Sequence, residues 1–206
     1  MSISIIIIII TVVTSIYGWN NSDRLSAWMM NPYMVNHKNQ YYRFVTSGFI
    51  HSNYIHLAFN MITFYFFGTV LEQVFTNYFG SIGTIYFLVL YFGGMIVADI
   101  PTFLKYRNNS NYNSLGASGA VSAAVFASIL FYPTAKLCLF FAICMPGFIF
   151  GILFLLYSYY QGRRMTDSIN HDAHFYGAIF GIVFSIILEP TVITSFFNQI
   201  ANYSFF

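Results

Sequence analysis

Long apolar runs, separated by short polar or Pro/Gly breaks, dominate the chain. A helix that crosses a bilayer needs about 20 predominantly apolar residues, and most of these runs approach that length. The runs lie at residues 3–18, 54–76, 81–103, 118–132, 137–160 and 172–188. The pattern therefore predicts an all-α membrane protein, a bundle of six transmembrane helices. We expect residues 1–206 to form a single membrane domain.

The fourth run is shorter than the others. Gly116 and Pro133 bracket it, which leaves about 15 residues, or roughly 22 Å of helix. The hydrocarbon core is about 30 Å thick, so this helix falls short by roughly 8 Å. We therefore expect the fourth helix to be partly buried, with the polar segment 108–114 dipping inward to line a wet cavity. The connection 19–50 is long and mixed, which favours a functional segment at the membrane interface.

Composition strengthens the membrane assignment. The chain is 58% hydrophobic and 7% charged, whereas soluble domains carry about 25% charged residues. No basic run is present to bind nucleic acid. The first run lacks the basic flank and cleavage site of a signal peptide, so we expect a retained helix. Cys138 and Cys144 lie six apart in an apolar run, which does not imply a disulfide framework.

The rare polar residues within the apolar runs gather at one membrane face. The second, fourth and sixth helices all start from the same side, because alternate helices of such a bundle run parallel. The polar residues at or near their N-terminal ends are His51, His56, Asn60, Ser118 and His174. Ionisable residues at membrane depth are expensive and point to function. The spacing therefore predicts one site built from three helices.

Ser118 is the candidate nucleophile of this site. A serine hydroxyl reacts only when a base lies within hydrogen-bond reach. Gly116 and Gly119 allow a tight turn, and the Ser118 amide at a helix N-terminus can point at an oxyanion. The alternative interpretation is a small-residue packing face, since Ser118 and Ser122 form a small-xxx-small pair.

The sixth helix supplies the candidate base. His174, Gly177 and Gly181 share one helix face, and the two glycines allow a neighbouring helix to approach closely. We expect that neighbour to be the fourth helix, which would hold His174 near Ser118; a lone interfacial histidine is the alternative. His56 and Asn60 also share a face and suit an oxyanion hole, or else they form inter-helix hydrogen bonds.

Metal chemistry is not expected. The H-E-x-x-H pattern is absent, and His171 and His174 lack an obvious third ligand. We predict no metal and no cofactor.

Four short motifs lie between about residues 40 and 185. They are Tyr42-Arg43, His51-x4-His56-x3-Asn60, Gly116-Ala117-Ser118-Gly119 and Ala173-His174-Phe175-Tyr176-Gly177. Together, and in this order, they resemble the motifs of the rhomboid family of intramembrane serine proteases.

This resemblance implies an endopeptidase that cleaves a transmembrane or juxtamembrane segment of membrane-protein substrates in the lipid bilayer. Ser118 would be the nucleophile and His174 the general base, then the general acid. His56, Asn60 and the Ser118 amide would bind the oxyanion. His51 would be structural or accessory.

The resemblance also implies features of the framework. Arg43 would pair with Glu72, and the fifth helix, 137–160, would act as a lateral gate, although ordinary lipid-facing residues fit its composition equally. The bacterial inner membrane is the expected location. There the family opens its site outward, whereas the excess of Lys and Arg on the site side favours the cytoplasmic face.

Two other functions remain open. One is a catalytically silent rhomboid-like protein that binds membrane helices, which the presence of both Ser118 and His174 disfavours. The other is a small transporter or channel, which the absence of repeats and the one-sided clustering of polar residues disfavour.

Overall fold

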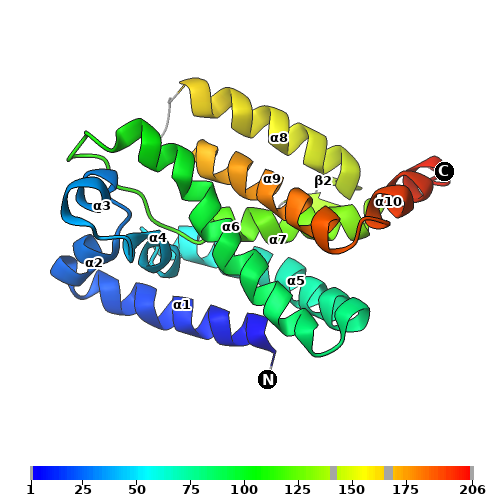
Figure 1. The fold of residues 1–206 in the computed structure, drawn as a ribbon, viewed down its shortest axis with the longest axis horizontal. Coiled ribbons are helices and arrows are strands. Elements are labelled where there is room, and N and C mark those ends of the chain that lie inside the picture. Colours follow the sequence, from blue (N-terminus) through cyan, green and yellow to red (C-terminus); the bar gives the residue numbers. More distant parts are fainter. Residues whose placement is uncertain (1, 140–142, 165–168, 205–206) are drawn as a thin grey trace.

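A computed structural model describes residues 2–139, 143–164 and 169–204, which are mostly helical (Figure 1). The long elements are α1 (Ile3–Trp19), α5 (Tyr54–Phe79), α6 (Ile82–Tyr106), α7 (Ser118–Phe131), α8 (Gly147–Arg164) and α9 (His171–Leu188). The short ones are α2 (Ser22–Trp28), α3 (Pro32–Lys38), α4 (Arg43–Thr46), the 3-10 helix η1 (Ser47–Phe49), β1 (Lys136–Leu139), β2 (Ile143–Pro146) and α10 (Val192–Ala201).

Helix α7 is the centre of the bundle. It packs against α5, α6 and α9, while α1 lies outside α5 and α8 lies outside α9 (Figure 1). Every residue from Gly119 to Phe131 is buried. The first half of α7 consists mainly of glycine, alanine and serine, so the surrounding helices approach its backbone closely. The fourth helix is therefore short, as predicted, but almost wholly rather than partly buried.

Within the part of the chain that the structure describes, three helices, α5, α6 and α9, are long and apolar enough to cross a membrane. Helices α1 and α7 are apolar but shorter, with 17 and 14 residues. All five lie where the sequence predicts apolar helices. The structure thus agrees with an all-α membrane protein, while the number of six spans stays a prediction.

The prediction for the fifth run, 137–160, is wrong in its first part. Strands β1 and β2 form an antiparallel hairpin there, and α8 starts only at Gly147; residues 140–142 lie outside the described residues. Cys138 pairs with Cys144 across the hairpin and forms a disulfide with it. This bond was not expected from the sequence, because the run was predicted to form a helix rather than two facing strands.

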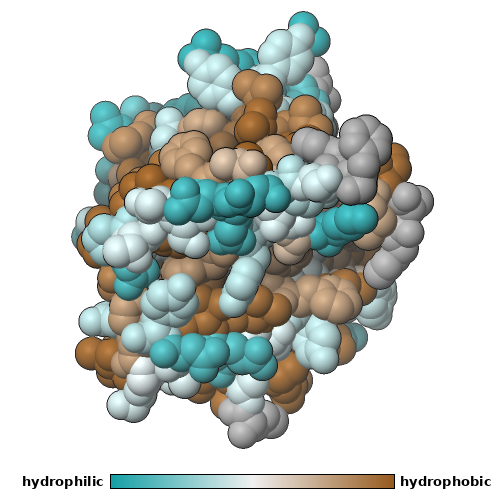
Figure 2. All heavy atoms as spheres, turned by 90° about the vertical axis from the view of Figure 1, so that its right-hand side faces the viewer, coloured by the Kyte–Doolittle hydropathy of each residue, from teal (hydrophilic) through white to brown (hydrophobic). Residues whose placement is uncertain are grey.

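The connection 19–50 folds into α2, α3, α4 and η1 at one end of the bundle (Figure 1). The N-terminal ends of α5, α7 and α9 point toward this same end, as the sequence predicts (Figure 1). An isolated β-bridge between Met30 and Ser114 ties the connection to the segment before α7. The opposite end of the bundle shows a patchwork of hydrophilic and hydrophobic residues (Figure 2).

Candidate active site

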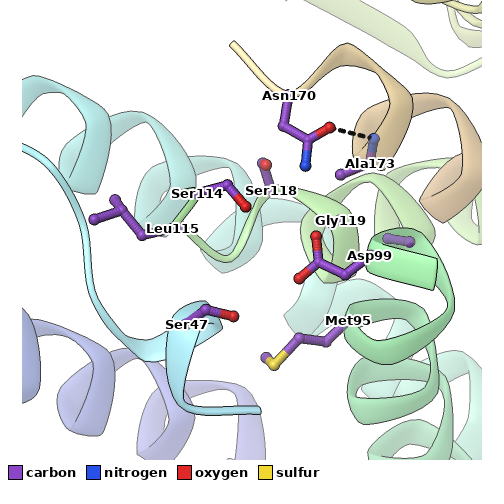
Figure 3. Close-up of a pocket in the computed structure, with 11 residues that line it drawn as sticks. Ser47, Met95, Asp99, Ser114, Leu115, Ser118, Gly119, Asn170 and Ala173 are labelled. Carbon is purple, nitrogen blue, oxygen red and sulfur yellow. Dashed lines mark hydrogen bonds between the residues drawn. The ribbon is translucent and has the colours of Figure 1, made fainter. Parts of the chain in front are cut away.

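Ser118 is the first residue of α7 and follows a tightly held turn. Gly116 adopts a φ of 119°, a conformation that favours glycine. The Gly116 amide donates to the Ser47 carbonyl at 2.9 Å, and the Ala117 amide donates to His51 Nε2 at 3.3 Å. These contacts fix the start of α7. The Ser118 side chain is half-buried and lines a small cavity (Figure 3).

The contact between α7 and α9 is made at the level of the backbone. A Cβ atom added to Gly177 would overlap the Gly119 carbonyl, and one added to Gly181 would overlap the Ala123 carbonyl. Larger residues at either position would force the helices apart. The structure confirms the predicted packing of the Gly177–Gly181 stripe on the small face of the fourth helix.

His174 lies in the first turn of α9, beside this contact. Its ring stacks near Phe154 of α8, with centroids 6.1 Å apart, and lies 5.8 Å from the His171 ring. The neighbours Gly119 and Ala173 face each other across the two helices. No hydrogen bond joins Ser118 and His174, both of which the structure describes. Catalytic hydrogen bonds often tighten only when substrate binds, so this geometry fits both a protease and a catalytically silent protein.

His56 and Asn60 lie on α5, on the other side of the Ser118 turn. The His56 ring covers Gly116: a Cβ added there would lie 2.8 Å from His56 Nε2. His56 Nδ1 pairs with Ser52 Oγ at 3.1 Å, which leaves Nε2 facing the turn. The Asn60 side-chain amide donates to the His56 carbonyl at 3.0 Å. One of its two N–H groups is therefore used within the helix.

His51 links three parts of the framework. It is fully buried. Its Nδ1 pairs with Ser15 Oγ of α1 at 3.1 Å, and its carbonyl accepts from Trp19 Nε1 at 2.7 Å. Burial, with the neighbouring His56 as a smaller cause, lowers the pKa of His51 to about 3. The neutral ring can accept the Ala117 amide at Nε2 while donating from Nδ1 to Ser15.

Arg43 and Glu72, both of which the structure describes, do not form the expected ion pair. Arg43 donates from one Nη to the carbonyls of Ser26 and Met29, at 2.9 and 2.6 Å. Arg43 therefore stabilises the connection 19–50 through hydrogen bonds to other parts of the same connection. A guanidinium carries only donors, and converging backbone carbonyls can accept them without a carboxylate.

Glu72 instead caps the N-terminus of α1. Its carboxylate accepts from the Ile3 and Ser4 amides at 2.7 and 2.9 Å, and from the Ser2 and Ser4 hydroxyls. Unsatisfied amides and the helix dipole make a helix N-terminus favourable for a carboxylate.

The other wall of the Ser118 cavity was not predicted from the sequence. Besides Ser118, the cavity is lined by Ser47, Met95, Ala98, Asp99, Ser114, Leu115, Gly116, Gly119, Asn170 and Ala173 (Figure 3). Asn170 caps α9 by accepting from the Ala173 amide at 3.1 Å, and it also accepts from Thr102 Oγ1 at 3.0 Å. An available signal was Asp99 itself, which is the one acidic residue within the predicted run 81–103.

Comparison with known proteins places these residues in a family. The sequence profile of the rhomboid domain matches residues 38–191, which include Ser118 and His174. "RHOMBOID-like protein 12, mitochondrial" from Arabidopsis thaliana is 30% identical, over 73% of this chain and 48% of that protein. The chain thus spans about half the length of that relative. The relative's name gives no support to the expected bacterial inner membrane. Since the profile covers most of the chain, this integral membrane protein belongs to the rhomboid family.

Proposed function

We propose that this chain is an intramembrane serine endopeptidase with a Ser118–His174 dyad. The observation that carries the proposal is the backbone contact between α7 and α9. There Gly177 and Gly181 let the helix that bears His174 approach the helix that bears Ser118. A nucleophile and a base on two helices in backbone contact need only side-chain rotation to meet.

The proposed reaction follows from these positions. His174 accepts the Ser118 proton as the hydroxyl attacks the substrate carbonyl, and an acyl-enzyme forms. His174 then protonates the departing amide nitrogen. The Ser118 amide, His56 Nε2 and the remaining Asn60 N–H would stabilise the oxyanion. Water then releases the acyl group, with His174 again as the base.

The substrates we propose are membrane proteins with a transmembrane helix. The scissile segment must leave its helical conformation to present a carbonyl to Ser118, so helix-weakening residues near the cleavage point favour the reaction.

Labelling with a fluorophosphonate probe tests the dyad. We expect the purified protein in detergent to be labelled on Ser118, as located by mass spectrometry of the modified peptide. Ser118→Ala should remove the label, and His174→Ala should slow it by about 100-fold or more, because the base no longer activates the hydroxyl. A label on another residue, or equal labelling of His174→Ala, would contradict the proposal.

A catalytically silent protein that binds membrane helices is the second candidate. It is favoured by one observation, namely that no hydrogen bond joins the described residues Ser118 and His174. Such a protein would bind a transmembrane peptide without labelling by the probe and without cleavage.

A further inference from the structure

The cavity beside Ser118 contains polar groups that no part of the proposed dyad uses. Its volume is about 20 Å³, roughly what one water molecule needs. Ser118 and Gly119 form one wall, and Asp99 of α6 and Ser114 point into the space from other walls (Figure 3). The remaining contacts include the apolar side chains of Met95 and Ala98. The cavity is thus small, with both polar and apolar walls.

Two of these polar groups have no partner within the described part of the chain. Ser114 Oγ is buried without a hydrogen bond. The half-buried Asp99 carboxylate takes part in no hydrogen bond or ion pair among residues 2–139, 143–164 and 169–204. The nearby Asn170 differs, because Thr102 and the Ala173 amide both donate to it. The unpaired groups face the cavity, so an occupant that donates a hydrogen bond would satisfy them.

Substrate would bring such an occupant to this place. During acylation the carbonyl carbon of the cleaved residue is bonded to Ser118 Oγ, so that residue's side chain starts only two bonds from this carbonyl carbon. Because Ser118 itself lines the cavity, a short side chain reaches the space. The volume leaves no room for the long stems of Lys or Arg.

We propose that Asp99 is a specificity-determining residue, which selects a short hydroxyl-bearing residue, serine or threonine, on the N-terminal side of the cleaved bond. This inference rests on the proposed protease function. A hydroxyl donates to the Asp99 carboxylate and accepts from Ser114 Oγ. An apolar side chain of the same shape displaces water and leaves both groups unpaired, which is how polar sites reject apolar analogues.

The test compares paired substrates that differ only at this residue: threonine against valine, which have the same shape, and serine against alanine. The full chain is assayed in liposomes with a single-helix reporter. For the wild type we expect kcat/KM to be about tenfold higher for threonine than for valine. Asp99→Leu should bring the ratio within about twofold of one. Asp23→Asn, at an exposed site in α2, is the control and should keep the wild-type ratio.

Two further arms keep the inference falsifiable. If Asp99→Leu does not fold, Asp99→Asn carries the test, and the ratio should fall at least about threefold because an amide oxygen accepts more weakly than a carboxylate. If the wild type cleaves no reporter, the proposed function fails on its own. Competition between threonine and valine peptides for binding to Ser118→Ala then decides the role of Asp99. Equal affinity of Ser118→Ala for the threonine and valine peptides would overturn the inference. A preference for threonine that is unchanged when Asp99 is also replaced would overturn it too.

Discussion

The two sides of α9 are packed in different ways. Toward α7, Gly177 and Gly181 rest directly on the backbone carbonyls of Gly119 and Ala123. Toward α8, the contacts are made by side chains, such as the His174 ring near Phe154. Helix α7 is buried from its second residue to its last, whereas only Gly147, Gly151, Ser158 and Gly162 are buried in α8.

The backbone contact between α7 and α9 therefore holds the candidate site residues in place, whereas the side-chain contacts of α8 can adjust. Backbone contacts leave no side chain to rearrange, so the distance between the helices of Ser118 and His174 is fixed. Side-chain contacts can change rotamer at small cost. We expect substitutions in the α7–α9 contact to lower the free energy of unfolding strongly, and substitutions in the contacts of α8 with α7 and α9 to lower it little.

Gly181→Ala should have the largest effect. The new Cβ would overlap the Ala123 carbonyl, which cannot rotate away, so the helices must separate. We expect the free energy of unfolding to fall by about 3 kcal/mol. Reversible unfolding in mixed micelles measures it. A loss below about 1 kcal/mol would show that the contact is looser than the structure indicates.

Gly116→Ala should act on the turn before Ser118. Its φ of 119° disfavours any side chain, and the Cβ would meet the His56 ring at 2.7 Å. We expect a loss of about 2 kcal/mol in stability and a fall in kcat of roughly 100-fold, because Ser118 is displaced. Stability and reporter cleavage are measured on the same preparation. A wild-type kcat in Gly116→Ala would show that catalysis does not depend on the conformation of this turn.

Acid should weaken the link that His51 makes between α1 and the Ser118 turn. Its folded-state pKa of about 3 lies below the ordinary value of 6.5, so between these pH values the unfolded chain binds more protons. Stability should therefore be complete above pH 6.5 and fall by up to ~1.4 kcal/mol per pH unit below it. His51→Gln should flatten this slope in pH-dependent unfolding. His37→Gln, at an exposed position, is the control. Equal slopes in His51→Gln and wild type would contradict the assignment.

Gly151→Ala is the mild counterpart of Gly181→Ala. Gly151 of α8 faces α7, and a Cβ there would lie 3.4 Å from the Phe126 ring, an ordinary contact with a side chain that can shift. We expect a change of less than about 0.5 kcal/mol. The same unfolding assay applies, and a loss as large as that of Gly181→Ala would remove the contrast between the backbone contact of α7 with α9 and the side-chain contacts of α8.

The features that the sequence predicts well are those with a strong local pattern. The spacing of Gly177 and Gly181 marks the face that meets α7, and the glycines around Ser118 mark the turn. The β1–β2 hairpin was missed because a short apolar run fits a strand or a helix equally well. Its pairing brings Cys138 opposite Cys144, which spacing alone did not reveal.

The contacts of the charged residues were harder to predict from the sequence. The predicted pair of Arg43 and Glu72 assumed that rare charged residues bind one another. Instead, backbone carbonyls accept hydrogen bonds from Arg43, and Glu72 accepts hydrogen bonds at the N-terminus of α1. Asp99 was overlooked because it belongs to no motif, and only the fold brings α6 beside Ser118. Long-range contacts of this kind depend on how the helices pack, which periodicity does not specify.

Cleavage of a reporter membrane protein is the most direct test of the proposed Ser118–His174 dyad. The reporter carries one transmembrane helix with helix-weakening residues near its end and is reconstituted in liposomes with wild type, Ser118→Ala or His174→Ala. We expect the wild type to release the cleaved fragment, Ser118→Ala to release none, and His174→Ala to be at least about 1000-fold slower. Fragment release by Ser118→Ala at the wild-type rate, or an intact reporter with wild type, would contradict it.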